Sequence, residues 1–194
     1  MKIKNVLLLN MLCCLGLFSG TNVSADEALW QALAQGGKVV LMRHGAVMQG
    51  RGQGNSLLRD PSCQQERNLS REGEQQARRI GERFRQHQVT VAEVRYSPFC
   101  RTAATAKLAF DSGREADELG LLEVLPPPQA AAQTAKLRQL IGAYRGDGNL
   151  ILITHEPNIN AISFETMRHA DFLVLQPLGG EEFEELGVIG RDEE

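Results

Sequence analysis

Three short segments, far apart in this chain of 194 residues, carry side chains that could act together on a phosphate group. They are Arg43-His44-Gly45, the segment Ser97–Thr102, which contains Arg101, and the segment Thr154–Asn158, which contains His155. Arginine donates two parallel hydrogen bonds to a phosphate and keeps its charge, so Arg43 and Arg101 could hold the group. A histidine between them could attack phosphorus and form a covalent intermediate. The pattern predicts phosphoryl transfer through His44.

A histidine nucleophile must be unprotonated at the attacking nitrogen, and the leaving oxygen needs a proton donor. The neighbouring arginines oppose protonation of His44. A backbone carbonyl from the loop that begins at Gly45 could fix its tautomer. His155 could donate to the phosphate oxygens, and Glu156 directly after it is one candidate for the proton donor.

The elements that must position these residues follow from the apolar pattern. Strands are predicted over residues 38–43, 89–96 and 149–154, each ending in a polar segment, and a shorter strand over 119–125. Helices are predicted over residues 26–36, 70–88, 101–110, 130–144 and 158–167, and a C-terminal hairpin over 171–176 and 182–189. Alternating strands and helices predict an α/β fold of three αβα layers with a mainly parallel sheet. Ligands bind such sheets at the carboxyl ends of the strands, where the three segments would meet.

The same segments resemble the motifs of the histidine phosphatase superfamily, which includes phosphoglycerate mutases and acid phosphatases. Leu41–Gly45 looks like its RHG signature, Ser97–Ala106 is similar to its S-x-x-x-R-x-x-x-T-A segment, and Thr154–Ile159 is similar to the segment with the second histidine. The resemblance covers residues 38–165 and implies a histidine-phosphatase-like fold in which His44 becomes phosphorylated. The other phosphate-pocket residues that it implies are Arg43, Arg101 and His155.

The resemblance leaves the proton donor open between two branches of the superfamily. In the acid phosphatase branch an Asp follows the second histidine, and here Glu156 takes that place. That branch also has a third arginine four residues after the first, where this chain has Val47. In the mutase-like branch the donor comes from a middle segment, where Glu118 and Glu123 lie. We expect Glu156 to be the donor, with Glu118 or Glu123 as the alternative.

The N-terminus has the pattern of a secretory signal peptide. Lys2 and Lys4 precede an apolar run over residues 6–18, and the small residues Val23-Ser24-Ala25 follow. An apolar run this short does not span a membrane comfortably, so no stable membrane span is expected. Cleavage after residue 25 would leave one domain, residues 26–194, in the periplasm or secreted.

Residues 45–69 form a long segment that is rich in glycine, serine and asparagine and has no helical or strand period. Long loops in a compact domain are often functional, so we expect this loop to bind substrate. Arg51 and Asn55 are the side chains of the loop that could reach the phosphate.

Two cysteines, Cys63 and Cys100, remain after the predicted signal peptide. An even number of cysteines in an exported protein favours a disulfide, which here would tie the loop to the site; the alternative is two buried free thiols. Two histidines outside the motifs, His87 and His169, are expected to be structural.

Composition and missing motifs exclude several classes of function. The chain has a formal net charge of −3 and no basic stripe, so nucleic acid is not an expected partner. It has no P-loop motif and no His/Cys cluster with the spacing of metal ligands, and the chemistry above needs no metal or cofactor. We expect an exported phosphomonoesterase. The resemblance to short exported members of the superfamily implies a phosphorylated envelope sugar as its substrate, as in the glycolipid core of lipopolysaccharide, and a soluble phosphate ester is the other main choice. The alternatives are a phosphate-sugar-binding module without catalysis and a phosphomutase.

Overall fold

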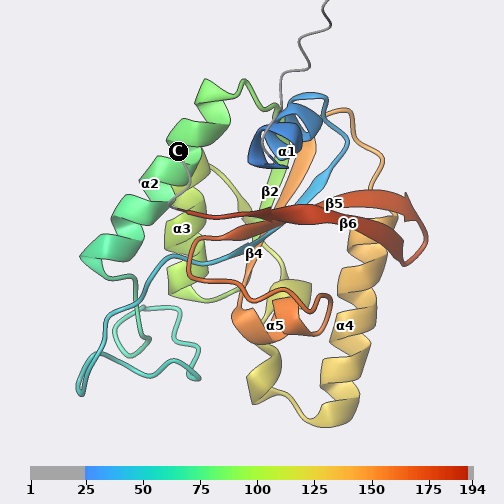
Figure 1. Ribbon diagram of the computed structural model, residues 1–194. Coiled ribbons are helices and arrows are strands. Elements are labelled where there is room, and N and C mark those ends of the chain that lie inside the picture. The colour runs from blue at the N-terminus through green and yellow to red at the C-terminus, as the bar shows by residue number, and fades with distance from the viewer. Residues whose placement is uncertain (1–24, 192–194) are drawn as a thin grey trace, which may run out of the picture.

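The centre of the fold is a buried pair of parallel strands, β1 (Val39–Arg43) and β4 (Asn149–Thr154). The computed structural model describes residues 25–191, so the predicted signal peptide, apart from its last residue, lies outside the described residues. The pair belongs to a six-stranded sheet with the order β3-β2-β4-β1-β5-β6 (Figure 1). The other strands are β2 (Val91–Tyr96), β3 (Arg114–Glu115), β5 (Phe172–Gly179) and β6 (Glu182–Ile189). Three pairings are parallel and two are antiparallel, so the sheet is mainly parallel, as predicted.

Helices cover both faces of the sheet, which confirms the predicted three-layer αβα arrangement (Figure 1). They are α1 (Ala25–Ala34), α2 (Arg71–Gln86), α3 (Cys100–Phe110), α4 (Pro127–Gly142) and α5 (Glu156–Asn160), with two short 3-10 helices, η1 (Asp117–Leu119) and η2 (Leu122–Val124). No helix in the described part of the chain is long and apolar enough to cross a membrane.

The fold has two hydrophobic cores, one on each face of the sheet, and the central strands contribute side chains to both. Val40 and Met42 of β1 belong to the core that contains α1, α2 and α3, whereas Val39 and Leu41 belong to the core that contains α4 and α5. Side chains alternate along a strand, so a strand that is covered on both faces needs an uninterrupted apolar run. This is the reason that the run before Arg43 is visible in the sequence.

The register of the central strands brings the three predicted segments to one edge of the sheet. Arg43 pairs with Thr154 at the ends of β1 and β4. The amide of His44 donates to the carbonyl of Thr154 at 3.1 Å, and the amide of Ser97, just after β2, donates to the carbonyl of Ile153 at 3.0 Å. The residues that follow the three strands therefore lie side by side, as the parallel arrangement predicts.

The predicted C-terminal hairpin is confirmed. Strands β5 and β6 pair antiparallel, and β5 also pairs antiparallel with β1. The beginning of β5 therefore lies beside the end of β1, and the residues just before β5 reach the same edge of the sheet as His44.

The strand predicted over residues 119–125 is wrong. The 3-10 helices η1 and η2 occupy this segment, and β3 before them pairs with β2 instead. Leu119 and Leu121 are buried, as alternate residues of a strand would be. The backbone here, however, forms hydrogen bonds with side chains and not with a neighbouring strand. The carbonyl of Leu119 accepts from Oγ1 of Thr154 at 2.8 Å, and the amide of Leu122 donates to Oδ1 of Asn158 at 3.2 Å.

The helix predicted over residues 158–167 is wrong in its length, because α5 ends at Asn160. Beyond it the hydroxyl of Ser163 accepts from the amide of Glu165 at 3.1 Å, a local bond that competes with a continued helix. The chain then turns so that the carbonyl of Met167 accepts from Nη1 of Arg43 at 2.6 Å.

The start of α2 lies directly against the loop that follows His44. Oγ of Ser70 caps the helix by accepting from the amide of Gly73 at 3.1 Å, and the amide of Ser70 donates to the carbonyl of Ala46 at 2.9 Å. A Cβ atom on Gly73 would overlap the carbonyl oxygen of Ala46. Glycine at this position therefore lets α2 hold the backbone next to His44.

Gly73→Ala should lower the free energy of unfolding by about 2 kcal/mol, because the added methyl group overlaps packed backbone. At an open helix position the same change would raise stability by up to ~1 kcal/mol. Glu74→Ala, at the exposed next position of α2, is the control. Urea unfolding measures both variants, and a Gly73→Ala protein as stable as the wild type would contradict the close approach.

Candidate active site

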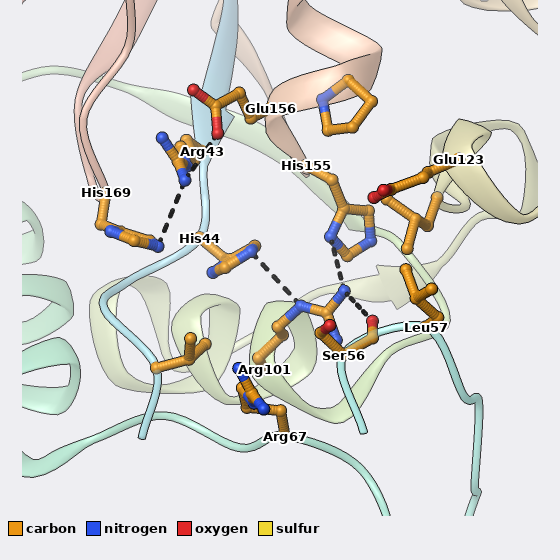
Figure 2. A pocket seen from close by; sticks show the side chains of 13 residues that line it. Arg43, His44, Ser56, Leu57, Arg67, Arg101, Glu123, His155, Glu156 and His169 are labelled. Carbon is orange, nitrogen blue, oxygen red and sulfur yellow. Dashed lines mark hydrogen bonds and ion pairs between the residues drawn. The ribbon is translucent and has the colours of Figure 1, made fainter. Parts of the chain in front are cut away.

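A pocket opens at the edge of the sheet where β1 and β4 end (Figure 2). Its lining residues are Arg43, His44, Val47, Ser56, Leu57, Arg67, Arg101, Leu121, Glu123, His155, Glu156, Pro157 and His169. The pocket brings together all four residues that the motifs predict for a phosphate site. Three arginines and three histidines line it, which is an unusual concentration of nitrogen donors and acceptors.

His44 is held in the tautomer that a nucleophile needs. Its Nδ1 lies 2.8 Å from the carbonyl oxygen of Gly45, which accepts a hydrogen bond, so the proton is on Nδ1 and Nε2 is unprotonated. Nε2 faces the pocket and accepts from Nε of Arg101 at 3.3 Å. Burial of the ring, followed by the charge of Arg101, lowers the pKa of His44 well below its ordinary value. The carbonyl expected from the Gly45 loop is confirmed.

His155 is also neutral and oriented by its neighbours. Nδ1 accepts from Nη2 of Arg101 at 3.2 Å, since an arginine can only donate, and Nε2 therefore carries the proton that is shared with Oγ of Ser97 at 2.7 Å. Burial, then the charge of Arg101, lowers the pKa of His155 well below its ordinary value. One guanidinium group thus contacts both imidazoles (Figure 2).

The three arginines of the pocket share a property that points to an anionic ligand. Within residues 25–191, the buried side-chain nitrogens and oxygens without a hydrogen-bond partner are Nε of Arg43, Nε of Arg67 and Nη1 of Arg101. A buried donor without a partner costs roughly 1–3 kcal/mol. Oxygens of a bound phosphate would compensate this cost, and Arg101 keeps its charge for that purpose even though burial lowers its pKa to about 10.

Arg43 is fixed from three directions. Its Nη1 donates to the carbonyl of Met167 at 2.6 Å, while its Nη2 forms an ion pair with Oε2 of Glu156 at 2.8 Å and donates to Nε2 of His169 at 3.3 Å. Figure 2 shows Glu156 and His169 on either side of this guanidinium. The contacts hold Arg43 next to His44.

Two of the basic residues that line the pocket, Arg67 and His169, are not among the predicted site residues. Arg67 has no motif around it, and whether it reaches the pocket depends on the conformation of the loop of residues 45–69. His169 was expected to be structural, yet a signal existed: it lies two residues before the predicted hairpin, which begins at residue 171. A strand that runs antiparallel beside β1 must begin at the edge where β1 ends, and so a residue just before it lies near His44.

Arg51 and Asn55 do not line the pocket, contrary to expectation. Oδ1 of Asn55 accepts from the amide of Leu57 at 2.8 Å and so shapes the loop, and Arg51 is exposed in a turn. The loop instead contributes Ser56, whose carbonyl accepts from Nη2 of Arg101 at 3.1 Å.

The predicted disulfide between Cys63 and Cys100 is confirmed, with its Cα atoms 5.8 Å apart. A second link lies beside it: the buried carboxylate of Glu66 accepts from the amide of Asp60 at 2.9 Å and from the amide of Cys100 at 2.8 Å. Both links end on the residue before Arg101. They couple the loop to the start of α3.

The three carboxylates considered as proton donors lie in different places. Glu156 and Glu123 line the pocket. Glu156 pairs with Arg43, and the carboxylate of Glu123 points toward His155 (Figure 2). Glu118 does not line it and lies 3.6 Å from Nη1 of Arg95. Among the described residues, no group of three or more His, Cys, Asp or Glu side chains is arranged to hold a metal ion.

Comparison with known families agrees with this geometry. The family model described as the histidine phosphatase superfamily (branch 1) matches residues 39–122, which confirms the predicted resemblance over that part of the chain. No curated protein matches the chain significantly in a sequence comparison.

Solved structures share the fold. The protein histidine phosphatase SixA in complex with tungstate has a TM-score of 0.60 at 16% identity, and the match covers 79% of this chain and 97% of that chain. The putative phosphohistidine phosphatase SixA from Agrobacterium tumefaciens has a TM-score of 0.55 at 16% identity, with the same coverage of 79% and 97%. Phosphoglycerate mutase from Thermus thermophilus has a TM-score of 0.50 at 19% identity, covering 71% and 92%. The fold is therefore histidine-phosphatase-like.

The stability of the protein should fall as the pH falls from about 6.5 toward 4, because an unfolded histidine binds a proton that the half-buried, neutral His169 does not bind. Burial and Arg43 lower the pKa of His169 to about 4. The contribution of His169 to the free energy of unfolding is therefore complete above the pKa of an unfolded histidine, and it is lost as the pH falls toward the pKa of His169 in the folded protein. His169→Asn should reduce the slope of unfolding free energy against pH in this window. Urea unfolding at several pH values tests this, and identical slopes for the two proteins would contradict it.

Proposed function

We propose that this protein hydrolyses phosphomonoesters through a phosphohistidine intermediate on Nε2 of His44. One observation carries the proposal: this unprotonated nitrogen lies in a pocket with three arginines, each of which has a buried nitrogen without a partner among residues 25–191. The match to the histidine phosphatase superfamily supports the same class of reaction.

The chemistry proceeds in two balanced steps. Phosphate oxygens accept hydrogen bonds from the arginines, and Nε2 of His44 attacks phosphorus. The P–O bond to the leaving alcohol breaks as that oxygen takes a proton from a carboxylic acid side chain. The bond from Nδ1 to the carbonyl of Gly45 stabilises the positive charge that the ring gains. Water then gives a proton back to the same acid and attacks phosphorus, and the P–N bond breaks to release phosphate and restore the neutral ring.

We propose Glu123 as the proton donor, in place of the Glu156 expected from its position after His155. Oε2 of Glu156 already accepts from Arg43 at 2.8 Å, which suits it to hold that guanidinium. Glu123 has no ion pair in the described part of the chain, and its carboxylate points toward His155 (Figure 2). Its place next to the second histidine favours contact with a leaving oxygen.

The substrate and its compartment are further parts of the proposal. The predicted signal peptide would bring the enzyme outside the cytoplasm, where a phosphorylated envelope sugar of a glycolipid or a soluble ester could be the substrate. The fold is shared with proteins described as phosphohistidine phosphatases and as a phosphoglycerate mutase. Assays with water against phosphorylated acceptors would separate hydrolysis from mutase activity.

Rapid-quench trapping with a labelled phosphoester should leave acid-labile, base-stable label on the wild-type protein and none on His44→Ala. The label requires the lone pair of Nε2, which alanine removes. His87→Ala is the matched control, because His87 stacks on Trp30 with ring centroids 4.3 Å apart, away from the pocket, and it should keep the label. Label that persists on His44→Ala, or no label from any of a broad panel of esters, would refute the proposal.

Glu123→Gln should slow hydrolysis of alkyl phosphates about 100-fold and that of nitrophenyl phosphate only a few fold, since a good leaving group needs no proton. Glu156→Gln should lower kcat/KM for both substrates alike, mainly by raising KM, because the loss of the ion pair disturbs Arg43. Steady-state kinetics on matched esters distinguish the two. The reverse pattern would identify Glu156 as the donor.

A further inference from the structure

Each of the three arginines that line the pocket already binds other groups of the protein. Arg43 is paired with a carboxylate, Arg101 donates to two histidines, and Arg67 donates to a loop carbonyl at 3.3 Å. The three histidines that line the pocket are neutral near pH 7, because burial lowers the pKa of each. Once a phosphate dianion is bound by the arginines, the described lining holds no further cation.

The side of the pocket beyond His155 is apolar or acidic. Figure 2 shows Leu57 and Glu123 on the far side of this histidine from Arg43. Elsewhere in the lining, Val47, Leu121 and Pro157 are apolar as well. None of these side chains offers a positive charge or an N–H donor that could bind an anionic group in place of water. Such a group would also lie near the carboxylate of Glu123.

Arg51 and Arg59, the other two arginines of the loop of residues 45–69, do not supply a cation on this side of the pocket. Nη2 of Arg59 is paired with Glu115 at 2.8 Å, and Nε of Arg59 donates to the carbonyl of Pro98 at 3.0 Å. Arg51 is exposed in its turn, and neither arginine lines the pocket. A second negative group on the substrate therefore has no built partner.

We propose that the alcohol half of the substrate carries no second anionic group and contacts Leu57 and Leu121 with an apolar side. The inference rests on the proposed function and deepens it, because it selects among phosphomonoesters. Esters of uncharged alcohols bind, whereas phosphorylated carboxylic acids and bisphosphates are rejected.

Three phosphonates that cannot be hydrolysed test this selection by titration calorimetry. The probes are 3-phosphonopropionate, its neutral carboxamide, and 3-methylbutylphosphonate, which replaces the carboxylate by an isopropyl group of similar shape. The carboxylate should bind at least tenfold more weakly than the amide, and the isopropyl compound at least as tightly as the amide. A carboxylate that binds as tightly as the amide would overturn the inference.

A substitution that adds a charge tests the same point in the opposite direction. Leu57→Lys adds a cation to the wall of the pocket and should improve binding of 3-phosphonopropionate relative to its amide at least fivefold. Leu58→Lys is the matched control: Leu57 and Leu58 are 46% and 38% exposed, but only Leu57 lines the pocket. A ratio that shifts equally in both variants would reflect overall charge and would overturn the inference.

Inorganic phosphate, titrated into the same protein, separates this inference from the proposed function. If phosphate and all three phosphonates fail to bind, the proposed function fails and the inference falls with it. If they bind and the carboxylate is not disfavoured, the inference alone is wrong.

Discussion

The burial of Arg101 is the constraint on which the site depends. Its side chain is only 3% exposed, lies over the ring of Phe99 at 4.4 Å, and donates to both His44 and His155. A guanidinium taken out of water costs several kcal/mol unless other groups replace its hydration. Neutral imidazoles replace it only in part, and Nη1 has no partner within the described chain. The unbalanced charge attracts an anion. Burial, and after it this charge, lowers the pKa of His44 and keeps its ring unprotonated.

The rest of the fold holds this charge in place. Parallel pairing of β1 with β4 and of β4 with β2 brings both histidines and the start of α3 to one edge of the sheet. The disulfide and the buried carboxylate of Glu66 then tie the loop to the residue before Arg101. That carboxylate is the negative charge that most favours the charged form of Arg101. Charge balance and loop position are therefore set by the same contacts.

The central strands and the four motif residues could be predicted because their signals are local. A strand covered on both faces requires a continuous apolar run, and each run ends where the polar residues begin. Arg67 and His169 could not be predicted in this way, because their place depends on contacts between distant segments. The same holds for residues 119–125, where side-chain hydrogen bonds from β4 and α5 replace a neighbouring strand. Loop 45–69 has no helical or strand period, and so its residue types alone do not show which of its side chains reach the pocket.

The central claim is that the arginine cluster and Nε2 of His44 form one site for a phosphoryl group. A crystal structure of the protein with vanadate tests this most directly, because vanadate adopts the five-coordinate geometry of phosphoryl transfer. Vanadium should be bonded to Nε2 of His44, with its oxygens contacted by Arg43, Arg67 and Arg101. Vanadate bound through Nδ1, or bound away from these arginines, would contradict it.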